Sequence, residues 1–189
     1  MKKILNIIFI SMILINCQKE LYIKEIISNN EVAIIRNNNN EDSLYLIVPL
    51  DFDININRSD IRNVQPYFMK DNKMATSVGD FLVAIRENNK YKYLYGFREL
   101  DYKTYPKSIT IISKNSISKN KGRELLEYYN SPKDIEKMNY GDTIFLVPYT
   151  QFRKDQPDFL SEMRKSPDSL FLILYKNKGN IQLREKINW

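Results

Sequence analysis

The 189-residue chain contains no histidine and only one cysteine, Cys17. Without histidine it lacks the usual general base, the Ser-His and Cys-His nucleophile pairs, and the commonest ligand of zinc, copper and iron. A single cysteine excludes an internal disulfide. Glycine is scarce, at five residues, and no G-x-G-x-x-G, G-x-x-x-x-G-K-S/T or G-x-S-x-G motif is present. Carboxylates, lysines, tyrosines and hydroxyls are therefore the groups left for any chemistry.

The chain also has no dense block of one charge. Its formal net charge is +6 at pH 7, from 29 basic and 23 acidic residues that are scattered along the sequence. This pattern does not indicate nucleic-acid binding, which needs a clustered basic face. The mild excess of lysine and arginine favours a modest attraction to anionic membrane surfaces.

A hydrophobic run lies at the amino terminus. Lys2 and Lys3 precede residues 4–15, where ten of twelve positions are apolar, and Cys17 follows the run. The run is shorter than the ~20 residues that a membrane-spanning helix needs. It has the length of the hydrophobic region of a secretory signal peptide. The lysines before the run and the lone cysteine at its end argue against an ordinary secretory signal or a buried helix.

Residues 1–18 resemble a bacterial lipoprotein signal peptide, with Leu14-Ile15-Asn16-Cys17 as the lipobox. The resemblance implies cleavage before Cys17 by signal peptidase II and a diacylglycerol on its sulfur. The family usually has Gly, Ala or Ser where this chain has Asn16. Gln18, in place of Asp, favours the outer membrane by resemblance to Gram-negative sorting, with the domain facing either the periplasm or the outside. Two acyl chains make such an attachment stable.

Removing residues 1–16 leaves 173 residues with a formal net charge of +4, because the removed segment holds two lysines and no acid. That length suffices for one domain with a hydrophobic core. We expect residues 17–20 to form the lipidated cysteine and a short tether, and residues 21–189 to form a single globular domain. Four extended residues reach only about 14 Å. The domain should therefore lie close to the membrane.

Alternating and β-branched segments predict strands over most of this domain. The predicted strands cover residues 21–27, 31–36, 43–48, 80–86, 91–97, 108–113, 143–147, 169–176 and 181–187. Three hairpins are expected among them: 31–48, 80–97 and 169–187. Pro49 is expected to end the second strand of the first hairpin or to mark an edge. Short helices are predicted over residues 61–69, 122–129 and 132–138, and from residue 155 to near residues 166–167.

Residues 51–57 alternate acids and amides with apolar side chains. Asp51 and Asp53 share the polar face, which predicts a half-buried strand with one solvated side. The pattern D-x-D-x-N also opens an EF-hand loop, but that loop needs Gly at its sixth position and Glu at its twelfth. Ile56 and Arg62 occupy those positions here. The EF-hand is excluded, and a different oxygen-ligand site at the two aspartates stays open.

Tyr91, Tyr93 and Tyr95 fall on one face of the predicted strand 91–97. Such a stripe can stack sugars or bases, and more often it packs in a core or pairs across strands. We expect the core role, with Tyr93 mostly buried, because no tryptophan joins the stripe. In an exposed stripe, the three tyrosines would be candidate ligand-binding residues, as are Asp51 and Asp53.

These patterns favour an α+β fold, in which one domain has a mostly antiparallel sheet of hairpins and three or four short helices. An all-β sandwich with peripheral helices is the alternative. Strands that are apolar on both faces are usually central in a sheet. They predict a core that contains Phe81, Val83, Ile85, Leu146, Leu172 and Leu174.

The sequence favours a non-enzymatic binding or accessory role for an outer-membrane lipoprotein that is anchored through Cys17. An immunity protein against an envelope-acting toxin suits the small size and the membrane tether. We expect no cofactor, no metal and no nucleic acid, and the expected partner is an envelope protein or a toxin. The alternative is a carboxylate-based hydrolase of envelope glycans or esters. Its best-placed acids, each beside a predicted strand end, would be Asp51, Asp53, Asp80 and Asp142.

Overall fold

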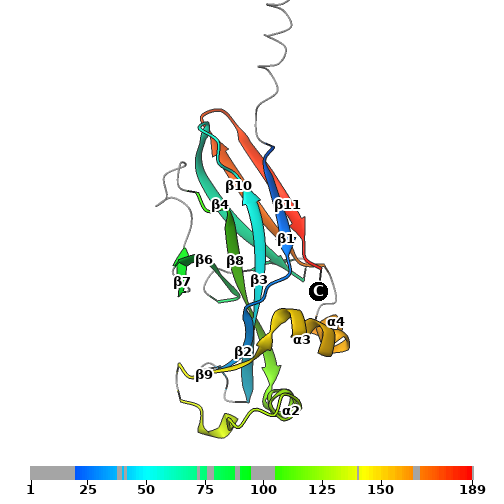
Figure 1. Cartoon of the computed structure of the whole chain (residues 1–189). Coiled ribbons are helices and arrows are strands. Elements are labelled where there is room, and N and C mark those ends of the chain that lie inside the picture. The colour runs from blue at the N-terminus through cyan, green and yellow to red at the C-terminus, as the bar shows by residue number, and fades with distance from the viewer. Residues whose placement is uncertain are drawn as a thin grey trace, which may run out of the picture.

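Two long strands, β3 (Ser43–Asn55) and β8 (Ser108–Ser118), run side by side through the length of the molecule (Figure 1). The computed structural model describes residues 20–37, 40, 42–71, 73–75, 79–87, 90–94, 105–139, 141–163 and 167–188. The alternation of β3 explains its place in the molecule. Side chains at its even positions from Leu44 to Ile54 are all buried, whereas Asp51 and Asp53 point to the other face.

β3 and β8 lie at the centre of a seven-stranded antiparallel sheet, here called sheet A. Its strand order is β7-β6-β8-β3-β2-β9, and β1 pairs with the later part of β3. The remaining strands of sheet A are β1 (Tyr22–Ile26), β2 (Glu31–Arg36), β6 (Phe81–Glu87), β7 (Lys90–Leu94) and β9 (Thr143–Pro148). The predicted hairpins at 31–48 and 80–97 are confirmed as β2–β3 and β6–β7, although residues 95–97 lie outside the described part.

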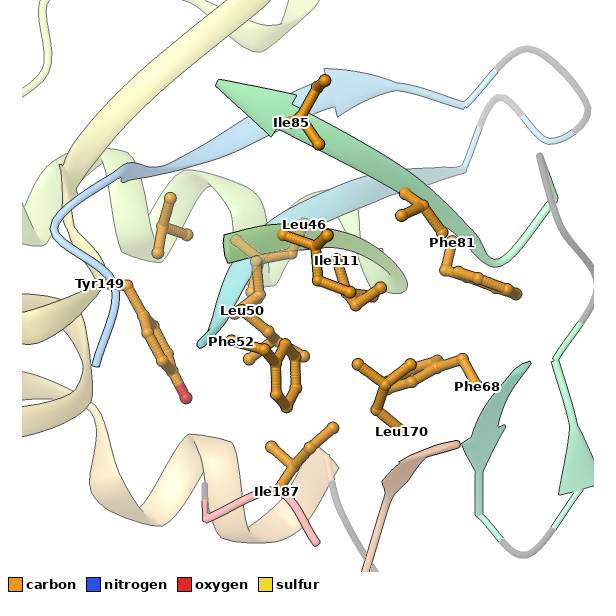
Figure 2. Packing of buried hydrophobic residues seen from close by; sticks show 14 of the residues in the cluster. Leu46, Leu50, Phe52, Phe68, Phe81, Ile85, Ile111, Tyr149, Leu170 and Ile187 are labelled. Atoms are coloured by element: carbon orange, nitrogen blue, oxygen red, sulfur yellow. The ribbon is translucent and has the colours of Figure 1, made fainter. Parts of the chain in front are cut away.

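A second antiparallel sheet, here called sheet B, has the order β11-β10-β4-β5. Its strands are β4 (Ile61–Lys70), β5 (Lys73–Met74), β10 (Ser169–Lys176) and β11 (Asn180–Lys186), so the predicted hairpin at 169–187 is also confirmed. The two sheets share one hydrophobic core (Figure 2). Phe68 of sheet B and Phe81 of sheet A meet there, with ring centroids 5.6 Å apart.

Short helices lie at the end of sheet A that sheet B does not cover (Figure 1). They are α2 (Lys119–Tyr128), the 3-10 turn η2 (Ile135–Lys137), α3 (Tyr149–Asp155) and α4 (Pro157–Met163). Ser118 caps α2 because its hydroxyl accepts a hydrogen bond from the Lys121 N–H at 3.1 Å. The result is a single sheet-rich domain with antiparallel sheets and three α-helices among the described residues.

The expectation that Pro49 ends the strand is wrong, and the alternative, that it marks an edge, is met only locally, where β3 lacks a second partner strand. β3 continues through Pro49, which is buried opposite Ile112 of β8. On the other side of β3, pairing with β2 stops at Ile47 and pairing with β1 begins at Asp51. Pro49 therefore lies in the gap between two partner strands, where its missing N–H costs no ladder hydrogen bond.

The predicted helix over residues 61–69 is also wrong, because this segment is strand β4. Its buried residues Ile61, Val64 and Phe68 have helix-like spacing. The spacing comes from a shift in register, since Tyr175 pairs with Asn63 while Lys176 pairs with Ile61. One extra residue in β4 brings two positions that are three apart onto the same face of the sheet.

Five of the six predicted core residues are buried, and none of those five is more than 8% exposed: Phe81, Val83, Ile85, Leu172 and Leu174. Leu146 is only partly buried. The prediction that the strand at residues 143–147 is central is wrong, because β9 is an edge strand of sheet A and Phe145 is 60% exposed. Helix α3 was not predicted, and the helix expected over residues 132–138 shortens to η2.

Candidate functional site

The structure brings three of the predicted site residues together on the outer face of sheet A, which is the face away from the shared core. In the strand register, Asp51 lies opposite Thr110, Thr110 opposite Ala84, and Ala84 opposite Tyr93. Tyr91 is two residues from Tyr93 and shares its face. Asp51 and the two tyrosines therefore form one cross-strand group. Cys17 and Tyr95 lie outside the described residues.

Asp51 is held by hydrogen bonds to both of its carboxylate oxygens. The Thr110 hydroxyl donates to Oδ1 at 2.5 Å, and the Asn30 side-chain amide donates to Oδ2 at 3.0 Å. Arg86 Nη1 donates to Asn30 Oδ1 at 3.2 Å, so Asn30 connects the aspartate to the arginine. The amide of Asn30 is fixed in turn by Ser28 Oγ at 3.0 Å. Asp51 is thus a fixed acceptor within a network.

Tyr91 lies within the electrostatic reach of this network. The pKa of Tyr91 is raised to about 12, first by burial and then by the negative charge of Asp51, while Arg86 acts in the opposite direction. The phenol oxygen is buried and has no hydrogen-bond partner among the described residues. Tyr91 therefore remains a neutral phenol at physiological pH, which suits hydrogen bonding and not nucleophilic chemistry.

The prediction that Tyr93 is mostly buried is wrong, since its side chain is 51% exposed. β7 is the end strand of sheet A, so Tyr93 has neighbours on one side only within the described sheet. The face of sheet A that Tyr93 shares with Asp51 is also polar and does not pack against the hydrophobic core. Asp53 is exposed on the same face, opposite Lys24 and Ser108, and does not join the hydrogen bonds around Asp51 that are described here.

The other two candidate acids, Asp142 and Asp80, lie in turns that precede strands. Asp142 is exposed, and its Oδ2 accepts a hydrogen bond from the Asn139 N–H at 2.7 Å, which closes the turn before β9. Asp80 sits at the turn before β6, where its carbonyl accepts from the Lys114 N–H at 2.9 Å. The Asp142 carboxylate therefore has a structural role in its turn, and the Asp80 backbone holds the start of β6.

A second surface was not predicted from the sequence. A groove of about 290 Å³ lies on the outer face of sheet B, and we call it the sheet B groove. Its lining residues come from β4, β5, β10 and β11: Tyr67, Met69, Met74, Phe171, Ile173 and Gln182. Met74 is 62% exposed. The outer face of an antiparallel sheet is usually polar, so an apolar groove there is a candidate binding surface.

The register of sheet B explains how the groove forms. Tyr67, Phe171 and Arg184 lie in one row across β4, β10 and β11. The Arg184 guanidinium covers the ring of Phe171, with Cζ 5.0 Å from the centroid, and Nη2 donates to Ser169 Oγ at 3.2 Å. Ile173 follows in the next row of the same face. The groove therefore has an aromatic floor and a fixed cation at one side.

The sequence did contain a signal for this groove. Leu170, Leu172 and Leu174 alternate with Phe171 and Ile173, so β10 is apolar on both faces. Such a pattern predicts a central strand with both faces covered by other parts of the protein. The three leucines are fully buried, whereas the intervening side chains remain partly exposed. One face of β10 therefore belongs to the core, and the other is an apolar face exposed to solvent.

Two further hollows lie near the helices and are polar. One is lined mainly by residues around η2 and the start of β9, and the other by residues at the start of α2. In the second, Glu136 forms ion pairs with Arg123 and with Lys119, the latter at 3.5 Å. The charges there satisfy one another, which gives this hollow a structural explanation.

In the described ranges, no three or more Asp, Glu or Cys side chains lie where they could hold a metal ion. None of the helices in those ranges has the length and hydrophobicity to traverse a bilayer. The chain matches no protein-family model, no curated protein and no solved structure in comparisons with known proteins. Function must therefore be argued from the surfaces themselves.

Proposed function

We propose that this protein is a membrane-anchored envelope lipoprotein that binds a protein partner through the sheet B groove and catalyses no reaction. The observation that carries the proposal is the solvent-facing row of Tyr67 and Phe171, extended by Ile173. Aromatic side chains on a partly exposed sheet offer a large contact area at low entropic cost. The groove is shallow and open along the sheet, which favours a protein surface over an enclosed small molecule.

The charge around the groove defines the kind of partner. On the described strands, the outward positions of β4, β10 and β11 hold Arg184 and Lys186 and no acid. Arg184 is already oriented over Phe171, so a carboxylate from the partner would meet a fixed guanidinium. We therefore assign the groove to a protein segment that presents apolar side chains next to acidic ones. A toxin with such a segment would make the chain an immunity protein.

The anchor in this proposal is the lipid on Cys17, and the location is the outer membrane. The support is the lipobox and Gln18 in the sequence. The short helices at one end of two antiparallel sheets favour the α+β class over an all-β sandwich with peripheral helices.

The geometry around Asp51 gives less support to the hydrolase alternative. A glycosidase-type hydrolase needs two acids about 5–10 Å apart. Both oxygens of Asp51 accept hydrogen bonds, and the raised pKa of Tyr91 keeps its phenol neutral. We interpret this network as structural or as part of a secondary contact.

Site-specific photocrosslinking of the full chain in its own cells tests the proposal. The photoreactive residue p-benzoylphenylalanine would replace Phe171 or Tyr67 in the groove, and Tyr128 as the control. Tyr128 is 56% exposed and lies on α2, far from sheet B along the molecule (Figure 1). We expect the same protein, with an acidic crosslinked segment, from both groove positions and not from position 128. Equal crosslinking from position 128, or no product from either groove position, would contradict the proposal.

A further inference from the structure

Three segments that are distant in sequence meet at the end of the molecule where β1 begins (Figure 1). They are residues 20–22, the turn between β3 and β4, and the turn between β10 and β11. Asn55 Nδ2 donates to the Glu20 carbonyl at 2.6 Å, and Arg62 Nε donates to Asn177 Oδ1 at 2.9 Å. We call residues 20–22, 55–62 and 176–180 the amino-terminal tip.

The amino-terminal tip carries more positive than negative charge. It holds Arg58, Arg62, Lys176 and Lys178 against Glu20 and Asp60. Asp60 is engaged by Arg58 at 2.9 Å and by Lys176 at 3.9 Å. Arg62 bonds only to the neutral Asn177 in the contacts described here, and Lys178 is exposed in the turn. These two cations are therefore the ones presented outward.

The position of the proposed anchor brings this charge close to a bilayer. Cys17 precedes Glu20 by three residues, and three extended residues span about 11 Å. Attraction between a basic residue and an anionic lipid surface decays over a Debye length, about 8 Å at physiological ionic strength. The hydrogen bond from Asn55 to Glu20 fixes the point where the tether enters the domain. A tether of this length lets the tip approach the bilayer closely enough for its cations to act.

We propose that the amino-terminal tip docks on anionic headgroups of the anchoring membrane, with Arg62 and Lys178 as the main contacts. This inference rests on the proposed lipidation of Cys17. Docking orients the long strands away from the bilayer and leaves α2 at the far end (Figure 1). The sheet B groove then faces sideways, where a partner in the envelope can reach it.

Fluorescence of the lipidated full chain in vesicles tests this orientation. The thioether at Cys17 leaves no free thiol, so Ser59→Cys creates a single labelling site within the tip. Asn120→Cys, on α2, is the control position. Each protein would carry an environment-sensitive dye in phosphatidylcholine vesicles or in an equal mixture of phosphatidylcholine and phosphatidylglycerol. We expect a blue shift and slower iodide quenching at position 59 only in the mixture, reversed by high salt, and no lipid dependence at position 120.

A charge reversal identifies the contact. Lys178→Glu should weaken the lipid-dependent protection at position 59 about five-fold or more, while the exposed Lys133→Glu at the far end should not change it. Protection at position 59 that is the same in both lipids, or that Lys178→Glu does not alter, overturns docking but not the anchor. Labelled palmitate is followed in the same preparation, and its absence from Cys17 overturns both the anchor and docking.

Discussion

Arg184 and Phe171 lie opposite each other in β11 and β10, and the guanidinium stacks on the aromatic ring with Cζ 5.0 Å from its centroid. Both side chains belong to the solvent-facing side of sheet B. An arginine that is held in this way loses little further freedom when it meets a carboxylate. This pair therefore gives the sheet B groove a preformed element of recognition.

Two neighbouring residues of β10 should separate stability from binding. Leu172 is fully buried, so Leu172→Ala should lower the free energy of unfolding by about 2–5 kcal/mol. Phe171 lies on the outer face, and Phe171→Ala should cost only about 1 kcal/mol. Urea unfolding monitored by circular dichroism measures both. Equal losses for the two variants would show that Phe171 is part of the core and not of an exposed surface.

Lipidation at Cys17 is the second prediction. Cells grown with labelled palmitate should incorporate label into the wild-type chain, because the lipobox directs acyl transfer to the cysteine. Cys17→Ser should remain unlabelled. Label that persists in Cys17→Ser would show that Cys17 is not the site of lipid attachment.

The third prediction concerns pH and the contact that joins the two sheets at β1 and β11. The Glu25 N–H donates to Glu185 Oε1 at 3.2 Å, and the Asn188 N–H donates to Glu25 Oε2 at 2.7 Å. Burial is the main cause that raises the pKa of Glu25 above its ordinary value of 4.5, and the charge of Glu185 adds to it. The folded protein therefore holds this proton more tightly than the unfolded chain does, so the contribution of Glu25 to stability falls as the pH rises through the raised pKa.

Glu25→Gln removes the charge but keeps an acceptor for Asn188. Relative to the wild type, this variant should gain stability as the pH is raised from about 4.5 to neutrality, in urea unfolding at each pH. A stability difference for Glu25→Gln that is independent of pH would refute the assignment.

Gly122 provides a prediction for the helical end. A Cβ atom at this position would clash with the Leu44 Cδ1 atom and lie 3.1 Å from the Ile135 Cδ1 atom. Leu44 is fully buried and has little room to move. Gly122→Ala should therefore destabilise the fold by about 1–3 kcal/mol, even though alanine is the better helix former. Asn120→Ala, exposed on the same helix, is the matched control, and a gain in stability for Gly122→Ala would contradict this account of α2 against β3.

Asp51→Asn distinguishes a structural network from a catalytic one. Removing the negative charge should lower the pKa of Tyr91 from about 12 toward its ordinary value of 10.0, measurable by nuclear magnetic resonance with labelled tyrosine. The wild-type protein should show no turnover of peptidoglycan, glycan or ester substrates. Turnover that is lost in Asp51→Asn would restore the hydrolase alternative and identify its acid.

Local patterns in the sequence were sufficient for the hairpins. Short polar turns between β-rich runs predicted β2–β3, β6–β7 and β10–β11, because both strands of a hairpin are encoded within one segment. The failures depend on contacts between distant segments. Pro49 is tolerated in β3 because it lies between the parts of β3 that pair with β2 and with β1. The buried residues of β4 have helix-like spacing because its register shifts against β10.

The candidate site shows the same division. Periodicity placed Tyr91 and Tyr93 on one face of a strand, but it gave no information on what covers that face. Nor did it show that Asp51 lies in the same cross-strand row, because that row is created by β8 and β6. The sheet B groove was missed because an apolar strand face looks the same in sequence whether it is covered or exposed.

The most direct test of the central claim is the crosslinking yield from position 67 in the full chain when the charge of Arg184 is reversed. Position 67 lies in the same row as Phe171 and Arg184, so the photoreactive group reports on contact with the groove. Arg184→Glu should reduce the yield roughly ten-fold, since the groove would then repel an acidic partner, while the distant Lys133→Glu should leave it unchanged. A yield that Arg184→Glu does not alter would contradict an acidic partner bound in the sheet B groove.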